Sequence, residues 1–189
     1  MLDPIPGSGF SAKQMMLFGQ IDMQIKLIHG YSAGTVLALY LTSNQSNRDE
    51  IDFEFLGNVT GQPYILQTNI YVDGHDDREE RIYLWFDPTI EFHTYSVLWN
   101  LYHVLFMVDR VPIRVFRNHA GEGVPYPQQQ PMGIKASLWD GGAWATRSGK
   151  DKVDWSKSPF RASFGEYRME GCAWRGDPRV CSTGWWNRR

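Results

Sequence analysis

Polar and apolar side chains alternate without a break in Gln20-Ile21-Asp22-Met23-Gln24-Ile25-Lys26-Leu27. A strand places successive side chains on opposite faces, so this period of two predicts a strand with one buried and one solvated face. The same pattern recurs in short runs at 35–41, 50–56, 64–71, 81–86, 94–99, 104–108, 113–116, 133–139 and 161–170. Clusters of Gly, Asn, Asp and Pro separate these runs and predict turns.

About ten short strands at a spacing of roughly ten residues are typical of an all-β sandwich or jelly roll. No long stretch carries a helical stripe, and neither an internal repeat nor a linker divides the chain. The 189 residues are enough for one domain or at most a small pair. We therefore predict one β domain.

Composition excludes several classes of protein. Nineteen Lys and Arg against 21 Asp and Glu give a net charge of −2, which does not favour a nucleic-acid partner. The apolar runs are far too short to span a membrane. No charged n-region or apolar h-region follows Met1, so we expect no signal peptide in this chain. Aromatic residues make up 14%, a share that suits both strands and sugar-binding surfaces, and composition does not separate these uses.

The run Asp49-Glu50-Ile51-Asp52-Phe53-Glu54-Phe55-Leu56-Gly57 carries the chemistry. On a strand, Glu50, Asp52 and Glu54 share one face, while the apolar side chains between them point to the other. Neighbouring carboxylates in this row start roughly 6.5–7 Å apart at Cα, so repulsion should raise at least one pKa. A retaining glycosidase needs one ionised carboxylate to attack the anomeric carbon and one protonated carboxyl roughly 5–5.5 Å away. The outer pair starts about 13 Å apart at Cα and must converge through side-chain lean and strand twist around a bound sugar.

Two other interpretations of the acidic row stay open from the residues alone. Antiparallel strands often show solvent a polar face, although such faces usually mix Thr, Lys and Glu. A calcium site would also use carboxylate oxygens, but the spacing is not that of a ligand loop. Asp52 is placed to hydrogen-bond Glu50 and to keep the protonation of the two glutamates unequal, which favours catalysis.

The segment from Glu50 to Gly57, followed by Asn58-Val59-Thr60, resembles the active-site strand of the xyloglucan endotransglucosylase/hydrolases, which are plant cell-wall enzymes of glycoside hydrolase family 16. Further matches are Gly7-Ser8-Gly9-Phe10, Phe18-Gly19, Ser32-Ala33-Gly34-Thr35-Val36, Gln67-Thr68-Asn69, Tyr83-Leu84-Trp85-Phe86-Asp87-Pro88-Thr89, Phe92-His93-Thr94-Tyr95-Ser96, Val111-Pro112-Ile113-Arg114-Val115-Phe116, Ser137-Leu138-Trp139, Trp144-Ala145-Thr146-Arg147, Asp154-Trp155-Ser156-Lys157 and Pro159-Phe160. The resemblance covers roughly residues 7–172. It implies a β-jelly-roll sandwich of two antiparallel sheets, of the concanavalin A-like kind, over 1–171, and a remnant of the C-terminal extension over 172–189.

By this resemblance Glu50 is the nucleophile, Asp52 the helper acid and Glu54 the general acid and base. The positions that it implies bind substrate are Glu54, Gln67, Thr68, Asn69, Asp77, Arg78, Glu79, Trp144, Ala145 and Gly149. The amides of Gln67 and Asn69 suit sugar hydroxyls, although an ordinary polar strand face would use the same residues.

Two aromatic residues and a loop pair have competing interpretations. Trp144 offers a platform on which a sugar ring can stack, whereas Trp139 suits the core as well as the cleft. Arg78 and Glu79 could equally be a solvated pair on a loop.

The resemblance also implies the protein's surroundings. Asn58 heads an Asn-Val-Thr sequon at which it implies an N-linked glycan, and it pairs Cys172 with Cys181, which the residues alone leave as a small disulfide loop or two free thiols. It implies secretion to the plant cell wall and apoplast, a monomer, no metal and no organic cofactor. The expected partners are a xyloglucan donor and a xyloglucan oligosaccharide acceptor, with no nucleic acid and no membrane.

Three departures from the family pattern stand out. Arg48 occupies the position where many members have His. The family's signal peptide and first strand are expected to be missing, as is most of its C-terminal extension. The Trp185-Trp186 pair is therefore interpreted as an uncovered cut edge, and the alternative is that these rings bind a ligand. An uncovered strand edge favours aggregation.

The reaction implied is cleavage of the β-1,4-glucan backbone of xyloglucan through a covalent glycosyl-enzyme, with transfer to a sugar hydroxyl or to water. A catalytically inactive carbohydrate-binding jelly roll and a lichenase-like hydrolase of unbranched β-glucan are the alternatives. A wall-associated sandwich without a site is a third.

Overall fold

The computed structural model describes residues 1–4 and 7–187. Its strands are β1 (Ser8–Ser11), β2 (Met16–Lys26), β3 (Thr35–Thr42), β4 (Glu50–Leu56), β5 (Ile65–Tyr71), β6 (Glu80–Tyr83), β7 (His93–Trp99), β8 (His103–Val108), β9 (Val111–Arg117), β10 (Gly133–Asp140) and β11 (Ser163–Ala173). Short 3-10 turns lie between and after them: η1 (Ala120–Glu122), η2 (Arg147–Gly149), η3 (Trp155–Lys157), η4 (Pro178–Ser182) and η5 (Trp185–Asn187). No helix in the described part of the chain is long and apolar enough to cross a membrane.

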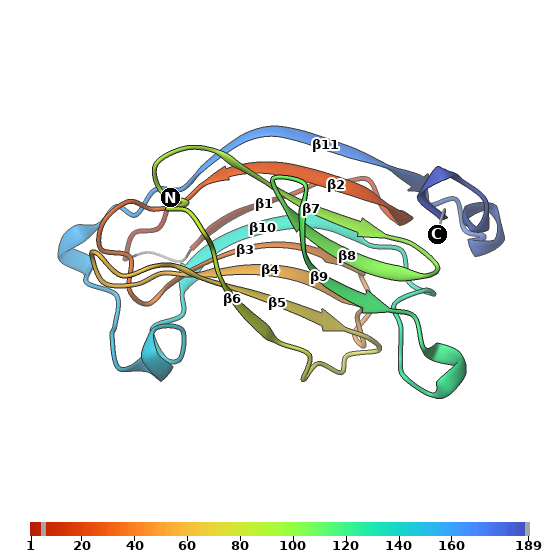
Figure 1. Ribbon diagram of the computed structural model, residues 1–189, viewed down its shortest axis with the longest axis horizontal. Helices are drawn as coiled ribbons and strands as arrows, with labels where there is room; N and C mark the ends of the chain where they lie inside the picture. The colour runs from red at the N-terminus through yellow and green to blue at the C-terminus, as the bar shows by residue number, and fades with distance from the viewer. Residues whose placement is uncertain (5–6, 188–189) are drawn as a thin grey trace.

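The strands form two antiparallel sheets. One sheet has the order β1-β10-β3-β4-β5-β6 and the other β11-β2-β7-β8-β9. The strands of both sheets arch in the same sense in Figure 1, and β4 lies in the interior of the first sheet. The predicted sandwich of two antiparallel sheets is confirmed.

Some strand limits differ from those expected. Strand β2 begins at Met16, before the alternating pattern. The pattern did not predict this start, because Met16 to Gly19 are all buried and show no polar alternation. The run 81–86 continues as strand only to Tyr83. Strand β1 was not expected, since all four of its residues are exposed and carry no alternating pattern.

The inner face of β4 anchors the strand in the core. Phe53 and Phe55 are fully buried, and Phe53 meets Phe106 of the opposite sheet edge to face at 5.2 Å between ring centroids. Phe55 meets Tyr95 in the same way at 4.6 Å. Removing such a ring costs about 3–5 kcal/mol, so these contacts hold β4 with its acidic face outward.

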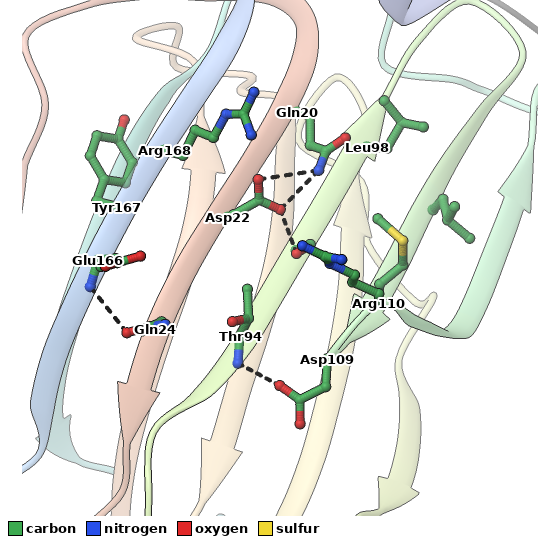
Figure 2. Close-up of a pocket in the computed structure, with 13 residues that line it drawn as sticks. Gln20, Asp22, Gln24, Thr94, Leu98, Asp109, Arg110, Glu166, Tyr167 and Arg168 are labelled. Atoms are coloured by element: carbon green, nitrogen blue, oxygen red, sulfur yellow. Dashed lines mark hydrogen bonds between the residues drawn. The ribbon is translucent and has the colours of Figure 1, made fainter.

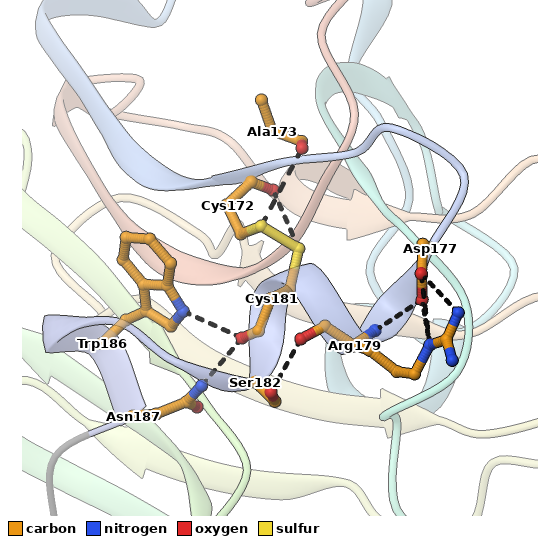
Figure 3. The surroundings of a disulfide bond; sticks show 8 residues. All are labelled: Cys172, Ala173, Asp177, Arg179, Cys181, Ser182, Trp186 and Asn187. Carbon is orange, nitrogen blue, oxygen red and sulfur yellow. Dashed lines mark hydrogen bonds and ion pairs between the residues drawn. A yellow bond between two sulfur atoms is a disulfide. The ribbon is translucent and has the colours of Figure 1, made fainter.

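The C-terminal segment is closed by a disulfide bond between Cys172 and Cys181 (Figure 3), which confirms the implied pairing. Trp186 Nε1 and Asn187 Nδ2 both donate to the carbonyl oxygen of Cys181, at 3.4 and 2.9 Å. Asn187 Oδ1 accepts a hydrogen bond from the backbone of Leu101 at 3.0 Å. The segment is therefore tied to strand β11 and to the turn between β7 and β8.

This arrangement corrects the expectation of an uncovered tryptophan pair. Trp186 is half-buried and packs against the hydrophobic core, whereas Trp185 is 41% exposed. Strand β11 continues through residue 171 to Ala173, and the division of the chain at residue 171 stays a prediction.

Candidate active site

The outer face of the six-stranded sheet carries the acidic row of β4, and strand register extends it into a grid. Residues directly opposite each other in an antiparallel pair point to the same face. The four rows across the sheet are Gly133, Thr42, Glu50 and Tyr71; Lys135, Tyr40, Asp52 and Asn69; Ser137, Ala38, Glu54, Gln67 and Arg81; and Trp139, Val36, Leu56, Ile65 and Tyr83. The first three rows are mainly polar and the fourth is apolar, so a sugar polymer would meet both hydrogen-bonding groups and flat apolar surface.

A cleft of about 380 Å³ opens over the first three rows. Its lining includes all three carboxylates of β4, with Arg48 and Tyr71 at one end. A larger hollow of about 870 Å³ lies on the outer face of the five-stranded sheet (Figure 2). There the Asp22 carboxylate is already bonded to Gln20 and Ser96. The larger hollow also has three acids, Asp22, Asp109 and Glu166, but they come from different parts of the chain. The smaller cleft is the better candidate for chemistry, because its three carboxylates stand in one row on β4.

Glu50 is held by an ion pair with the residue that departs from the family pattern. Arg48 Nε lies 2.9 Å from Glu50 Oε2, and the Glu50 side chain is 13% exposed. The Arg48 guanidinium also lies over the Tyr71 ring, 5.6 Å from its centroid. These two contacts fix the orientation of the Glu50 carboxylate at the edge of the cleft.

Asp52 is the most deeply buried of the three acids. Burial raises its pKa well above the ordinary value, and the charges of Glu50 and Glu54 on either side raise it further. Its Oδ1 atom has no hydrogen-bond partner among the described residues. A carboxyl in this position keeps its proton and can donate a hydrogen bond to a neighbouring carboxylate or to a sugar oxygen.

Glu54 is bonded to a neutral partner. Gln67 Nε2 donates to Glu54 Oε2 at 2.6 Å, and Arg81 Nε donates to Gln67 Oε1 at 2.8 Å. Burial raises the pKa of Glu54, the hydrogen bond from Gln67 opposes this, and the charge of Glu79 adds to the rise. Glu54 is thus surrounded so that it holds a proton to higher pH than an ordinary glutamic acid.

The two glutamates therefore lie in unlike surroundings on one strand. Both are half-buried, but Glu50 faces a guanidinium, whereas Glu54 faces an amide. Unlike surroundings are how an enzyme keeps one carboxyl ionised and another protonated. The geometry suits Glu50 as the base or nucleophile and Glu54 as the acid.

The substrate positions implied on β5 behave differently from one another. Gln67 and Asn69 point to the cleft face, opposite Glu54 and Asp52 respectively. Thr68 lies between them and points to the core, where it is 0% exposed and its Oγ1 accepts a hydrogen bond from Arg114 at 2.8 Å. The Thr68 side chain therefore faces away from the cleft, and a part for Thr68 in binding substrate stays a prediction.

The implied Asp77-Arg78-Glu79 stretch forms the loop between β5 and β6. Asp77 and Glu79 are exposed, and Asp77 has a φ of 66°. Arg78 Nη1 donates to the backbone carbonyls of Ile70, His75 and Asp76 at 3.0 to 3.2 Å, so part of this guanidinium builds the loop.

The implied positions after β10 lie beside the apolar row of the grid. Trp139 and Trp144 are half-buried, with ring centroids 6.0 Å apart. Ala145 is 2% exposed and its side chain packs with Val36 and Leu56, and its part in binding substrate stays a prediction. Gly149 has a φ of 79°, and a Cβ there would lie 2.2 Å from the Ala143 carbonyl oxygen, so its role is to allow the turn.

The predicted glycosylation residue lies just beyond β4. Asn58 is half-buried, its Nδ2 donates to the Pro63 carbonyl at 2.9 Å and its Oδ1 accepts from Val59 N at 2.9 Å. Since Nδ2 carries two hydrogens, this bond uses one of them, and glycosylation of Asn58 stays a prediction.

Sequence reasoning did not identify the residues that surround the acids from other strands. Tyr40, Lys135 and Arg81 reach the cleft face only through strand register, and Arg114 reaches β5 from the opposite sheet. The alternation of polar Arg81 with apolar Ile82 could have placed Arg81 on the outer face of the sheet. In the described part of the chain, no group of three His, Cys, Asp or Glu residues is arranged to hold a metal ion.

Comparison with known proteins supports the same interpretation of the site. The profile of Glycosyl hydrolases family 16 matches residues 1–157. The chain is 61% identical over 191 residues to a probable xyloglucan endotransglucosylase/hydrolase protein 10 of Arabidopsis thaliana, covering 99% of this chain and 64% of the relative. It is 56% identical to xyloglucan endotransglucosylase protein 34 of Populus tremula x Populus tremuloides, covering 100% of this chain and 65% of the relative. The chain thus spans a little under two thirds of the length of these relatives.

Solved structures share the fold. A Bacillus licheniformis beta-glucanase superposes with a TM-score of 0.70 at 23% identity, covering 85% of this chain and 70% of that chain. The Crh5 transglycosylase in complex with NAG superposes with a TM-score of 0.72 at 24% identity, covering 91% and 69%. At these identities the superpositions show the sandwich fold alone.

Proposed function

This chain belongs to family 16 of the glycosyl hydrolases, and on that premise we propose that it is a retaining xyloglucan endotransglucosylase/hydrolase. The observation that carries the proposal is the unequal pair on β4, with Glu50 ion-paired to Arg48 and Glu54 hydrogen-bonded to Gln67. The curated relatives named for xyloglucan support the choice of substrate.

In the first step Glu50 attacks the anomeric carbon while Glu54 gives its proton to the glycosidic oxygen. A bond forms between this carbon and a Glu50 oxygen, the glycosidic bond breaks, and the proton leaves with the reducing-end fragment. Asp52 holds a proton between the two glutamates, where it can hydrogen-bond the Glu50 carboxylate.

In the second step Glu54 accepts a proton from the incoming hydroxyl, and that oxygen attacks the same carbon. The bond to Glu50 breaks and restores its carboxylate, so the configuration is retained after two inversions. A sugar hydroxyl as acceptor gives transfer and water gives hydrolysis. The acceptor that reaches Glu54 is decided by how well a bound sugar excludes water from the cleft.

The surroundings are proposed on the same family basis. The protein would act in the plant cell wall after secretion, as a monomer, with a glycan on Asn58 and without a metal or organic cofactor. Its partners would be a xyloglucan donor and a xyloglucan oligosaccharide acceptor, with no nucleic-acid or membrane partner.

A transfer assay tests the proposal. The purified chain is mixed with xyloglucan and a fluorescent xyloglucan oligosaccharide, beside Glu50→Ala, Glu50→Gln and a control, Glu91→Gln, which alters an exposed acid outside the cleft. We expect label in long polymer with the wild type and the control, and none with either Glu50 variant.

Other outcomes select the alternatives. New reducing ends on unbranched mixed-linkage glucan but not on xyloglucan would support a lichenase-like hydrolase. Binding of xyloglucan without label or new reducing ends in any protein would support an inactive carbohydrate-binding domain and contradict the proposal.

A further inference from the structure

A buried arginine links the two sheets behind the cleft. Arg114 lies on β9 of the five-stranded sheet and is 7% exposed. Its Nη1 donates to the carbonyl oxygen of Thr68 at 3.0 Å and to Thr68 Oγ1 at 2.8 Å, and its Nη2 donates to the carbonyl oxygen of Arg78 at 2.6 Å. The guanidinium therefore crosses the sandwich to strand β5 and to the loop between β5 and β6.

This arrangement is costly for stability alone. Burying a guanidinium removes its hydration, and burial lowers the pKa of Arg114. Its charged partner, Glu80, lies 3.2 Å away with a side chain that is 57% exposed and so compensates only in part. An apolar side chain of similar volume often stabilises such a position at least as well. The arginine is therefore expected to serve the loop that it bonds.

That loop is built around a second arginine. The Arg78 guanidinium donates hydrogen bonds to the carbonyls of Ile70, His75 and Asp76. The Arg78 carbonyl accepts a hydrogen bond from Arg114. The side chain of Arg78 thus connects parts of the loop to one another. The backbone of Arg78 is held by a hydrogen bond from Arg114 of the opposite sheet. The position of the next residue, Glu79, follows from this attachment.

The same loop borders the catalytic cleft. The charge of Glu79 acts on Glu54, the proposed acid, and the phenol of Tyr71, which lines the cleft, bonds to Asp76. A displacement of residues 75–79 would therefore move a partner of Tyr71, which lines the cleft, and one of the charges that Glu54 faces.

We propose that Arg114 is a positioning residue, which holds the loop of residues 75–79 beside the cleft from across the sandwich, and this rests on the proposed function. Where the polymer substrate extends beyond Tyr71, it would meet a loop whose position is fixed by a side chain that it never touches. Loss of Arg114 should then weaken substrate binding more than it slows the chemical step.

The experiment compares Arg114→Met, which keeps the volume without the donors, with Arg114→Lys, which keeps one charged donor. Val104→Ala is the matched control, because it creates a cavity in β8 of the same sheet at a fully buried residue outside this network. Hydrogen exchange is followed at the amides of Gly74 and His75, which bond to the carbonyls of Arg48 and Val72. Steady-state kinetics with xyloglucan give KM and kcat for the same proteins.

For Arg114→Met we expect exchange at these two amides to rise at least about tenfold over the control, since a charge-assisted hydrogen bond that holds the loop is lost. We expect KM to rise several-fold with kcat nearly unchanged, and Arg114→Lys to recover part of both effects.

Unchanged exchange in Arg114→Met, or an equal rise in Val104→Ala, would overturn the proposal, because the arginine would then act only through global stability. Faster loop exchange with an unaltered KM would also overturn it, because the loop would not meet the substrate. If the wild-type protein shows no turnover, the proposed function fails, while the exchange data still decide whether Arg114 holds the loop.

Discussion

Replacing Asp52 by Asn tests whether the folded protein holds a proton at the centre of the acidic row. Asp52 lies between Glu50 and Glu54 on one strand face, with neighbouring Cα atoms roughly 6.5–7 Å apart. At about 7 Å and an effective dielectric constant of about 20, two like charges repel by about 2.4 kcal/mol. Because Glu54 is the protonated acid of the pair, the ionised Glu50 supplies this repulsion, which adds to the burial of Asp52 and which the charge of Arg48 opposes in part. The native protein should therefore keep this carboxyl protonated.

The stability difference between the two proteins follows from this proton. In the unfolded chain Asp52 ionises around its ordinary pKa of 3.8, whereas in the folded protein its pKa lies well above that value. As pH rises past 3.8, the unfolded wild type releases a proton that the folded protein keeps. The free energy of unfolding then falls by about 1.4 kcal/mol per pH unit relative to Asp52→Asn. The difference becomes constant once pH exceeds the folded-state pKa.

The assay is urea unfolding of both proteins at pH 4, 5, 6 and 7, followed by tryptophan fluorescence. We expect Asp52→Asn to become progressively more stable than the wild type as pH rises, and to lose turnover because a neutral amide cannot exchange a proton with Glu50. Asp151→Asn is the control for the sign of the change in the free energy of unfolding. The partner Arg147 lowers the pKa of Asp151, so that variant should be less stable than the wild type above pH 4.

The reasoning is refuted if the free energies of wild type and Asp52→Asn stay parallel from pH 4 to 7. It is also refuted if Asp52→Asn is the less stable protein at pH 7. Either result would mean that Asp52 is ionised in the folded state.

Three further variants probe the contacts around the site. Gln67→Ala removes the 2.6 Å hydrogen bond that lowers the pKa of Glu54; the alkaline limb of the pH–rate profile should move to higher pH, and an unmoved limb would contradict this. Arg48→Met should slow turnover while changing stability by less than about 1 kcal/mol, because the ion pair is half-exposed; unchanged turnover would show that Arg48 does not orient Glu50. Cys181→Ser opens the disulfide loop, whose sequence separation is 9, and should lower the free energy of unfolding in urea by about 2.6 kcal/mol. A wild-type stability that does not change on adding reductant would contradict this.

Alternation along the chain was enough to predict the two-sheet sandwich and the shared face of Glu50, Asp52 and Glu54. The parity of the side chains depends on the covalent geometry of one strand, so it can be seen without knowing what lies beside it. The same parity places Thr68 on the opposite face from Gln67 and Asn69, as the structure has it. The alternation alone would have placed the Thr68 side chain away from the cleft, whereas the family resemblance included Thr68 among the substrate positions.

The neighbours of these acids were decided only by the tertiary structure. Gln67 faces Glu54 because β4 and β5 pair in one register, and a shift of one residue would have turned Gln67 to the core. Arg114 meets Thr68 and Arg78 because two sheets pack face to face, although these residues are far apart in the chain. Local sequence carries no record of such contacts, because they depend on how distant strands pair and on which side chains fill the space between the sheets. The sequence by itself therefore determined which groups could do the chemistry, and strand pairing and the packing of the two sheets decided which neighbours those groups meet.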